Sequence, residues 1–213
     1  MKSELSVTNL HVFRGERHIL KGLAFELSAG SCLQVTGANG AGKTTLLRVL
    51  AGLIEPESLE LRWRGRARTP REPDYHADLS YLGHDAPLKV DLTGRENVAF
   101  SVGLRRRLTA SALGQALERV GAEAFADRPV RTLSAGQRRR IALAVLWLTG
   151  APLWLLDEPT TNLDVAGQAL VIGLMEEQLM RGGLVIAATH QPLAIDSARL
   201  RSMAIDTPGR GRG

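Results

Sequence analysis

Aromatic residues are scarce in this sequence: Phe, Trp and Tyr make up only 4 % of its 213 residues. Proteins that bind single-stranded nucleic acid stack the bases on aromatic side chains, so this composition argues against such a surface. There is one cysteine, Cys32, which excludes an intrachain disulfide and fits a reducing compartment. Hydrophobic residues make up 44 % and charged residues 23 %, an ordinary globular balance that provides enough apolar mass for a core.

A long apolar run is also missing. The most apolar stretch, residues 141–156, is shorter than the ~20 residues that a membrane span needs. Gly150 and Pro152 also interrupt it. The first ten residues, MKSELSVTNL, contain no apolar core of a signal peptide. We therefore expect a chain that does not cross a membrane itself and would act at one only through a partner.

The net charge of +5 comes from local arginine clusters, chiefly Arg105–Arg107 and Arg138–Arg140, with Arg210 and Arg212 near the end. Such a balance suits phosphates, acidic proteins or an anionic membrane surface. Because the clusters contain no aromatic residues, we expect no nucleic-acid partner. We interpret residues 138–140 as structural or interfacial, and residues 105–107 as a solvated face at a helix end.

The pattern of apolar residues predicts an α/β fold in a single domain, residues 1–206. Strands are expected at 5–13, 20–27, 31–37, 59–64, 79–82, 153–157 and 184–189. Helices are expected at 44–52, 96–104, 111–121, 138–148 and 164–181. The polar segment 65–78 is expected to be a loop, residues 88–150 a helical subdomain, and residues 207–213 a disordered basic tail.

The stretch GANGAGKT, residues 37–44, has the spacing of a phosphate-binding loop and lies between a predicted strand and a predicted helix. Gly40 and Gly42 allow successive backbone N–H groups to face one anion, and the helix N-terminus favours negative charge. Lys43 would reach the β- and γ-phosphates, and the Thr44 hydroxyl would bind Mg²⁺. The sequence therefore predicts a nucleotide site here.

A second motif, LWLLDE at residues 153–158, combines a buried strand with two acids. Asp157 emerges at the end of the strand, where it can hold Mg²⁺ through water. Glu158 follows directly and could orient or deprotonate an attacking water molecule. We therefore expect Asp157 to serve the metal and Glu158 to serve catalysis.

The sequence LSAGQ, residues 133–137, resembles the signature of ATP-binding cassette (ABC) ATPases. Further motifs in that family's order are found at residues 37–44, 81–84, 155–159, 160–164 and 188–190. The resemblance covers nearly the whole chain. It implies a P-loop nucleotide hydrolase with a mostly parallel core sheet, an N-terminal antiparallel β part and an inserted helical subdomain.

The resemblance also implies how ATP would be held. Two copies would pair head to tail, and Asn162 to Asp164 would form a loop across their interface. His190 would sense the γ-phosphate and contribute to catalysis with Glu158 and Lys43. The residues expected to contact nucleotide are Phe13, which would stack on adenine, Gly37, Ala38, Asn39, Gly40, Ala41, Gly42, Lys43, Thr44, Thr45, His84 and Asp164 and, from the other copy, Ser134, Gly136 and Gln137.

One position departs from the family pattern. The loop after residues 79–82 usually carries Gln, and this sequence has His84, which puts the usual Mg²⁺ and water contact of that loop in doubt. Together with residues 133–148 and 188–193, YLGH resembles the cassettes of cytochrome c biogenesis. That implies a peripheral protein on the cytoplasmic face of the inner membrane, with a membrane permease and haem-handling proteins as partners. ATP hydrolysis would then energise haem handling and the release of a haem chaperone.

Three alternatives stay open at this point. The chain could energise another exporter, of drugs, lipids or polysaccharides, and only the partner would distinguish this case. A soluble cassette that acts on DNA or ribosomes usually carries a second cassette or a long coiled-coil insertion, and neither is found in this sequence. A regulator that binds nucleotide without hydrolysis would not need Glu158 and His190.

Overall fold

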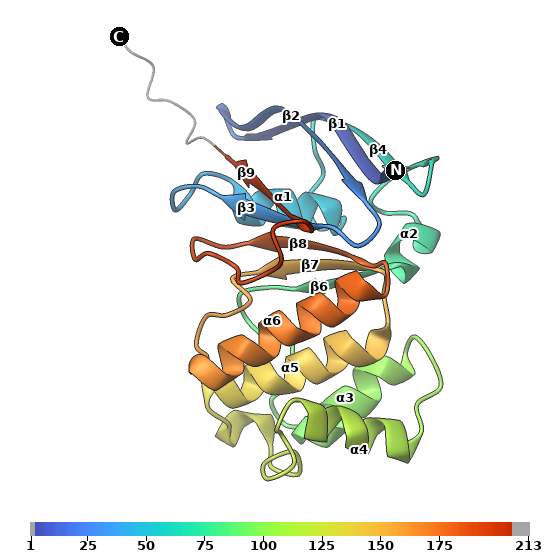
Figure 1. Ribbon diagram of the computed structural model, residues 1–213, viewed down its shortest axis with the longest axis vertical. Coiled ribbons are helices and arrows are strands. Elements are labelled where there is room, and N and C mark those ends of the chain that lie inside the picture. The colour runs from blue at the N-terminus through green and yellow to red at the C-terminus, as the bar shows by residue number, and fades with distance from the viewer. Residues whose placement is uncertain (1–2, 206–213) are drawn as a thin grey trace.

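The computed structural model describes residues 3–205, which form an α/β molecule (Figure 1). Its strands are β1 (Ser3–Arg14), β2 (Arg17–Ser28), β3 (Cys32–Thr36), β4 (Ser58–Trp63), β5 (Arg66–Arg68), β6 (Leu79–Leu82), β7 (Leu153–Asp157), β8 (Leu184–Ala188) and β9 (Leu200–Ala204). Its helices are α1 (Lys43–Leu50), α2 (Pro73–Ala77), α3 (Gly94–Gly103), α4 (Ala110–Arg119), the 3₁₀ turn η1 (Val130–Thr132), α5 (Ala135–Thr149) and α6 (Val165–Met180).

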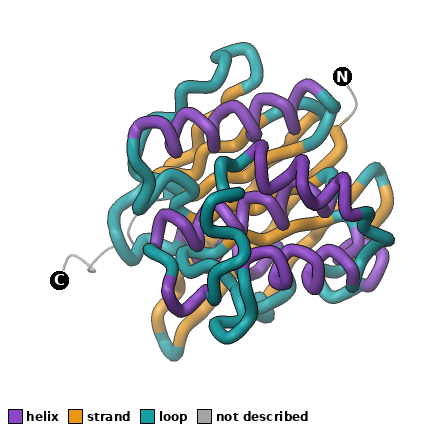
Figure 2. Tube along the Cα trace, turned by 90° about the horizontal axis from the view of Figure 1, so that it is seen from below, coloured by secondary structure: helices purple, strands orange, loops and turns teal. Residues whose placement is uncertain are grey.

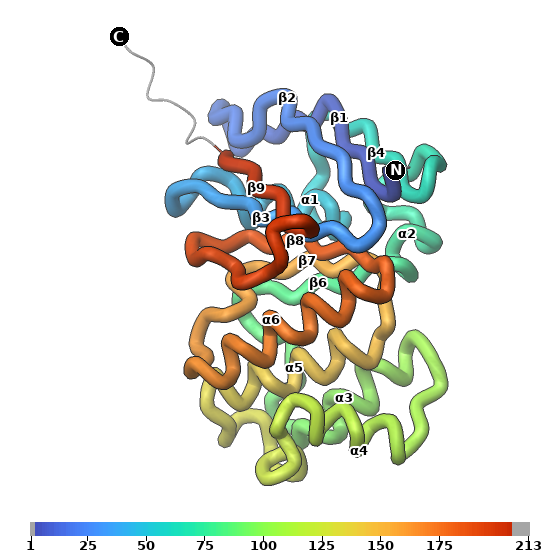
Figure 3. Tube along the Cα trace, viewed as in Figure 1, coloured from blue at the N-terminus to red at the C-terminus, as the bar shows by residue number. Residues whose placement is uncertain are grey.

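Two sheets organise the fold. An antiparallel sheet has the strand order β2-β1-β4-β5, and a fully parallel sheet has the order β6-β7-β8-β3-β9. Strands β3 and β9 pair along their whole length although they lie near opposite ends of the chain, as the colours of Figure 3 make clear. Because all five strands of the parallel sheet run in one direction, the loops that follow them meet at one edge.

Strands β7 and β8 of the parallel sheet are buried on both faces, which explains why they are continuous apolar runs. Side chains alternate along β7: Leu153 and Leu155 pack with α1 and the antiparallel sheet, whereas Trp154 and Leu156 pack with the helices on the other side. Helix α1 therefore lies between the two sheets, and α5 and α6 cover the opposite face of the parallel sheet (Figures 1 and 2). Helices α3 and α4 pack against α5 on the side away from the sheet (Figure 1).

Helix starts are fixed by side-chain caps. Thr93 with Glu96, and Ser134 with Gln137, form reciprocal capping boxes at the N-termini of α3 and α5. The Asp164 side chain accepts a hydrogen bond from the Gly167 N–H and caps α6. These caps determine where α5 and α6 begin, next to the loops that border the site.

The predicted fold class is confirmed, and every predicted strand has a counterpart within three residues at each end. The prediction of a plain loop at 65–78 was wrong, because β5 and α2 lie there and Tyr75 is fully buried. Strand β9 was also missed. Its exposed Arg201 and Ser202 hide the apolar pattern of a strand at the edge of the sheet. The tail 207–213 lies outside the described residues, and the subdomain boundaries at 88 and 150 stay predictions.

None of the helices within residues 3–205 is both long enough and apolar enough to cross a lipid bilayer.

Strand β7 is paired on both sides, with β6 and β8, and its enclosed side chains are important for stability. We expect Leu155→Ala, at a fully buried position, to lower the free energy of unfolding by about 2–5 kcal/mol, because it removes apolar contacts and leaves a cavity. Leu53→Ala, at a largely exposed position, should change it by less than about 0.5 kcal/mol. Urea denaturation of both variants measures the difference, and equal effects would contradict this account of the core.

Candidate functional site

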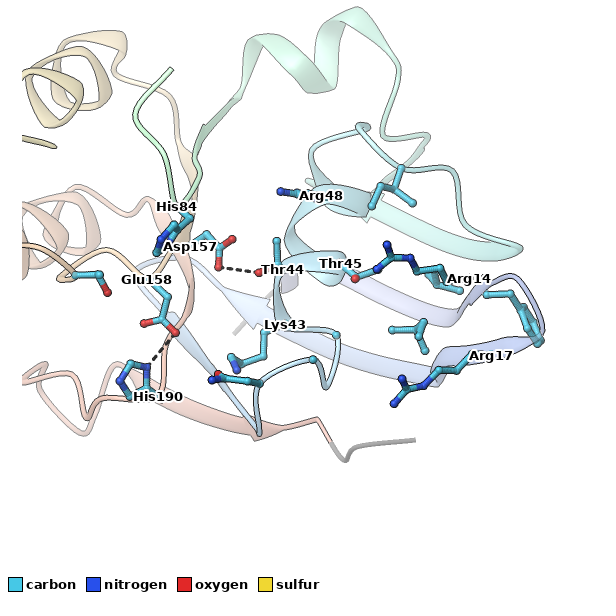
Figure 4. A pocket seen from close by; sticks show the side chains of 18 residues that line it. Arg14, Arg17, Lys43, Thr44, Thr45, Arg48, His84, Asp157, Glu158 and His190 are labelled. Atoms are coloured by element: carbon cyan, nitrogen blue, oxygen red, sulfur yellow. Dashed lines mark hydrogen bonds and ion pairs between the residues drawn. The ribbon is translucent and has the colours of Figure 1, made fainter. Parts of the chain in front are cut away.

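A large pocket opens at the carboxyl edge of the parallel sheet, where ligand sites form in open α/β folds. Its volume is about 1140 Å³. Figure 4 shows the side chains that line it. Four segments supply most of its lining: the β1–β2 hairpin, the loop between β3 and α1, the end of β7 and the end of β8. The lining residues are Val12, Phe13, Arg14, Arg17, Ile19, Asn39, Gly40, Gly42, Lys43, Thr44, Thr45, Arg48, Ile54, His84, Asp157, Glu158, Thr161 and His190.

The loop between β3 and α1 is a tight glycine turn. Gly42 has a φ of 116° as the residue before α1, and a Cβ there would lie 2.9 Å from Ile19 Cγ2. At Gly37, where φ is 144°, a Cβ would lie 2.5 Å from the carbonyl oxygen of Ile205. Both positions therefore require glycine, for backbone conformation and for space.

Lys43 is the first residue of α1, and its side chain bends back over this loop. The Nζ atom donates hydrogen bonds to the carbonyl oxygens of Gly37, at 2.8 Å, and Ala38, at 3.1 Å. The side chain is nearly buried, so the ammonium group is held by the loop instead of by bulk water. This arrangement puts a positive charge at the floor of the pocket, beside the N-terminus of α1.

The two predicted motifs meet at a direct contact. The Thr44 hydroxyl donates a hydrogen bond of 3.1 Å to Asp157 Oδ1 (Figure 4). Asp157 is only 3 % exposed. Burial raises the pKa of its carboxyl, the Thr44 hydrogen bond opposes this shift, and the charge of Glu158 adds to it. A hydroxyl and a carboxylate this close form a pair of hard oxygen ligands of the kind Mg²⁺ prefers.

Glu158 lies in a strained turn directly after β7. Its φ is +46°, which is unusual for a residue with a side chain. The Oε1 atom lies 3.1 Å from His190 Nδ1, and Oε2 is buried without a hydrogen-bond partner among the described residues. An unpaired buried acceptor is costly, so the geometry favours a polar ligand that donates a hydrogen bond to this carboxylate.

Phe13 lies at the far side of the pocket, in the β1–β2 hairpin, and is 48 % exposed. One face of its ring stacks on His18, with centroids 4.1 Å apart and planes inclined by 12°. His18 also stacks on His11, and His11 Nδ1 lies 3.0 Å from His18 Nε2. This stack holds the Phe13 ring at the pocket while part of its surface stays open.

Several cations that line the pocket were not predicted from the sequence. Arg14 and Arg17 come from the same hairpin as Phe13, and Arg48 lies on α1 (Figure 4). Arg48 was detectable in principle, because it follows Thr44 by four residues on the same helical face. Arg14 and Arg17 depend on how the hairpin packs against the rest of the molecule, and no local motif marks them.

Three of the predicted contact residues, Ser134, Gly136 and Gln137, do not line this pocket, and neither do Gly37, Ala38, Ala41 and Asp164. Gly37, Ala38 and Ala41 instead form the framework of the loop whose neighbours line it. Asp164 caps α6, and its Oδ1 lies 3.5 Å from Arg140 Nη2. Ser134 and Gln137 are engaged in the cap of α5, while a Cβ at Gly136 would approach Asn162 O at 3.0 Å.

His84 lines the pocket, its contact with nucleotide stays a prediction, and its charge would lower the pKa of Asp157. The arginine cluster at 138–140 serves the structure: Arg138 donates to Val130 O in η1, Arg140 donates to Val120 O at the end of α4, and Arg139 is buried. Arg105–Arg107 is exposed, as expected for a solvated face, and the Arg105 side chain donates a hydrogen bond to Leu79 O. No group of three or more His, Cys, Asp or Glu side chains within residues 3–205 could hold a metal ion by itself.

A glycine loop before a helix, a buried aspartate at the end of a neighbouring apolar strand and an adjacent glutamate together define a P-loop nucleotide hydrolase. The sequence pattern of the ABC transporter family matches residues 20–161. The chain belongs to this family, as one of its nucleotide-binding, ATP-hydrolysing cassettes. The predicted family and enzyme class are thereby confirmed.

Several similar proteins carry the name cytochrome c biogenesis ATP-binding export protein CcmA. The relative from Sodalis glossinidius is 45 % identical over 94 % of this chain and 95 % of its own length. The relative from Vibrio cholerae is 43 % identical over 96 % and 99 %, and one from Cupriavidus metallidurans is 47 % identical over 92 % and 93 %. The predicted resemblance to this group is confirmed.

Solved structures support the fold independently. A dimeric ATP-binding cassette in a post-hydrolysis state bound to ADP and Pi has a TM-score of 0.79 and 23 % identity, and covers 88 % of each chain. An ABC transporter protein from Pyrococcus furiosus has a TM-score of 0.80 and 21 % identity, with 94 % of this chain and 96 % of that chain covered.

The raised pKa of Asp157 has a consequence for stability. Because burial disfavours the ionised carboxylate in the folded state, Asp157→Asn should raise the thermal midpoint of the nucleotide-free protein at neutral pH. Each kcal/mol of relief corresponds to roughly 2–4 °C in a domain of this size. The gain should shrink as the pH falls through the raised pKa, where the wild-type carboxyl also becomes neutral. Calorimetry of wild type and Asp157→Asn, at neutral pH and at a pH below the raised pKa of Asp157, measures the difference between their thermal midpoints.

Asp127→Asn is a matched control, for which the expected change in stability has the opposite sign. Its carboxylate pairs with Arg95 at 2.7 Å, and this hydrogen bond lowers the pKa of Asp127. Removing that charge should reduce stability slightly at neutral pH, because the group is exposed. If Asp157→Asn also reduced stability, our account of the charge at Asp157 would be wrong.

Proposed function

We propose that the pocket binds ATP together with Mg²⁺, with the adenine on the Phe13 ring and the phosphates in the glycine loop. The single observation that carries this proposal is the convergence of Lys43, Thr44, Asp157 and Glu158 at one sheet edge (Figure 4). Backbone N–H groups of residues 37–45 would face the phosphates, and Lys43 would exchange its carbonyl contacts for phosphate oxygens.

Thr44 and Asp157 fit a magnesium ion, because their side-chain oxygens already lie 3.1 Å apart at the pocket floor. When bound, the ion would neutralise charge that develops on the phosphates. Asp157 and the Thr44 hydroxyl would hold the ion, Asp157 through water. His84 would stand near this position in place of the amide that related cassettes usually carry.

Hydrolysis would depend on Glu158. Its carboxylate would orient or accept a proton from the water molecule that attacks the γ-phosphate. His190, 3.1 Å from this carboxylate, would fix its direction and contact the γ-phosphate itself. The unpaired Oε2 supports this role, since it is an acceptor that nothing in the described residues satisfies.

The site would be completed by a second copy of the chain. Ser134, Gly136 and Gln137 lie at the N-terminus of α5 and outside the pocket of their own chain. In a head-to-tail homodimer they would face the γ-phosphate held by the other copy, with their backbone N–H groups favouring its charge. Asp164 would lie at the interface, in the loop that caps α6.

We further propose that the chain is the ATPase of an ABC transporter in c-type cytochrome biogenesis, at the cytoplasmic face of the inner membrane. The 43–47 % identity to cytochrome c biogenesis export proteins over nearly the whole chain supports this. Its partners would be integral membrane permease subunits and haem-handling proteins. ATP hydrolysis would energise haem handling or export and the release of the haem chaperone.

Glu158→Gln tests the hydrolytic role. We expect turnover to fall roughly 10²–10⁴-fold, because the amide cannot accept a proton from water, while ATP affinity is retained. Phosphate release measures the rate, and a fluorescent ATP analogue measures binding. An unchanged rate would contradict the assignment of Glu158.

Two further variants serve as controls. Glu118→Gln, on the exposed face of α4, makes the same chemical change away from the pocket and should leave the rate unaltered. Lys43→Ala should instead abolish tight ATP binding, because it removes the positive charge at the glycine loop. Retained affinity in that variant would mean that the loop is not the phosphate site.

The transport role is tested by isolating the tagged protein from its native membranes in mild detergent. We expect an integral membrane permease and a haem-carrying protein to be recovered, identified by mass spectrometry and by haem absorbance. An untagged strain provides the background. Recovery of a permease for drugs, lipids or polysaccharides would overturn the haem assignment and leave the ATPase chemistry intact.

A further inference from the structure

Arg139 is the one arginine of the 138–140 cluster that is fully inside the molecule, with 4 % of its surface exposed. All four of its hydrogen-bond acceptors are main-chain carbonyl oxygens. The guanidinium donates to Gly83 O at 2.6 Å, Asp157 O at 3.1 Å, Glu158 O at 3.0 Å and Pro159 O at 3.3 Å. Burial lowers the pKa of Arg139 to about 10, so the side chain stays protonated at neutral pH.

These four carbonyls belong to two separate loops that both border the pocket. Gly83 precedes His84, and the other three form the turn that leaves β7. The planar guanidinium presents several N–H donors in different directions, so one side chain can bind carbonyls of two loops. The ammonium group of lysine is a compact point charge and cannot reach both. Arg139 therefore fixes the distance between the His84 loop and the β7 turn.

The β7 turn needs such support because it contains strain. Glu158 has a φ of +46°, and strained backbone persists only where surrounding contacts over-determine it. Besides Arg139, two backbone hydrogen bonds hold Glu158: its N–H donates to Ala188 O at 2.8 Å, and its carbonyl oxygen accepts from the Thr161 N–H at 3.2 Å. This conformation directs the carboxylate to His190, at 3.1 Å.

Arg139 lies in the first two turns of α5, whose N-terminus carries Ser134, Gly136 and Gln137. The same helix end is tied to the loop before α6: Arg140 Nη2 lies 3.5 Å from Asp164 Oδ1, and Gly136 lies against Asn162 O. Any shift of this helix end therefore acts on the β7 turn through the hydrogen bonds of the buried Arg139 to Asp157 O and Glu158 O.

We propose that Arg139 is a positioning residue for ATP hydrolysis, which holds Glu158 in its strained conformation and joins the N-terminus of α5 to the His84 loop. The proposal rests on the proposed function only in taking Glu158 as the group that acts on the attacking water. When nucleotide bound to another copy contacts the N-terminus of α5, it would thus affect the position of the Glu158 carboxylate in the chain to which this α5 belongs. The two sites of a homodimer would be coupled through Arg139 in each chain.

Arg139→Lys keeps the charge and removes the fork. We expect kcat to fall on the order of 10²-fold, because a small displacement of the carboxylate is enough for such a loss. The KM for ATP and the affinity for a fluorescent ATP analogue should change little, since the glycine loop is untouched. Arg139→Gln is the second variant, in case lysine prevents folding, and it should lower kcat in the same way.

Two readouts separate positioning from a general structural effect. In a double-mutant cycle, adding Arg139→Lys to Glu158→Gln should cause almost no further loss of kcat, because the carboxylate that Arg139 positions is already gone. Hydrogen exchange of residues 157–161 without nucleotide should become faster in Arg139→Lys, since the turn loses its restraint. This second readout does not require ATPase activity, so it tests Arg139 even if the proposed function fails.

Arg138→Lys is the matched control. Arg138 is the neighbour of Arg139 on α5 and also donates to two carbonyl oxygens, those of Val130 and Arg131, which lie away from the pocket. It should leave kcat and the exchange of residues 157–161 unchanged.

Three results would overturn the proposal. They are a folded Arg139→Lys protein with wild-type kcat, an additive loss in the double mutant, and a parallel fall of kcat, nucleotide affinity and thermal midpoint.

Discussion

The burial of the parallel sheet on both faces is the constraint on which the rest of this protein depends. Strands β7 and β8 are completely enclosed, so a polar side chain can emerge only where each strand leaves the sheet. Asp157 and Glu158 emerge at the end of β7, and His190 lies just beyond β8. Since the strands are parallel, these groups converge with the glycine loop after β3. The polar groups of the site therefore lie together at one edge of the sheet, because the interior around β7 and β8 is apolar.

Much of this arrangement was predictable from sequence, because it follows from local patterns. The glycine spacing of residues 37–44 encodes the loop, and the apolar run before Asp157 encodes its strand. Other features depend on contacts between distant segments. The four carbonyls around Arg139 come from segments 18 to 56 residues away in the chain, and no local pattern distinguishes Arg139 from its half-buried neighbours Arg138 and Arg140. The positive φ of Glu158 is equally invisible in the sequence, since glutamate carries no preference for it.

Charge has two distinct uses in this molecule. The pocket lining carries four cationic side chains and two carboxylates, those of Asp157 and Glu158, which leaves an excess of positive charge suited to a polyphosphate. The cations are Lys43, Arg14, Arg17 and Arg48. In the interior, Arg139 donates hydrogen bonds to backbone carbonyls and joins the His84 loop to the β7 turn. The arginine cluster at 138–140 thus contributes mainly to internal structure, which explains how a basic cluster can occur without the aromatic residues that a base-binding surface needs.

The contact between Gly37 and the carbonyl of Ile205 links the start of the phosphate loop to the far end of the described chain. During synthesis, β3 leaves the ribosome early but waits for β9, its neighbour in the sheet, until about 170 further residues have been translated. Ile205 N–H also donates to Thr36 O, directly before the loop. A nascent chain that ends before β9 therefore carries every sequence motif of an ATPase, but it lacks the strand that completes the sheet beside the phosphate loop.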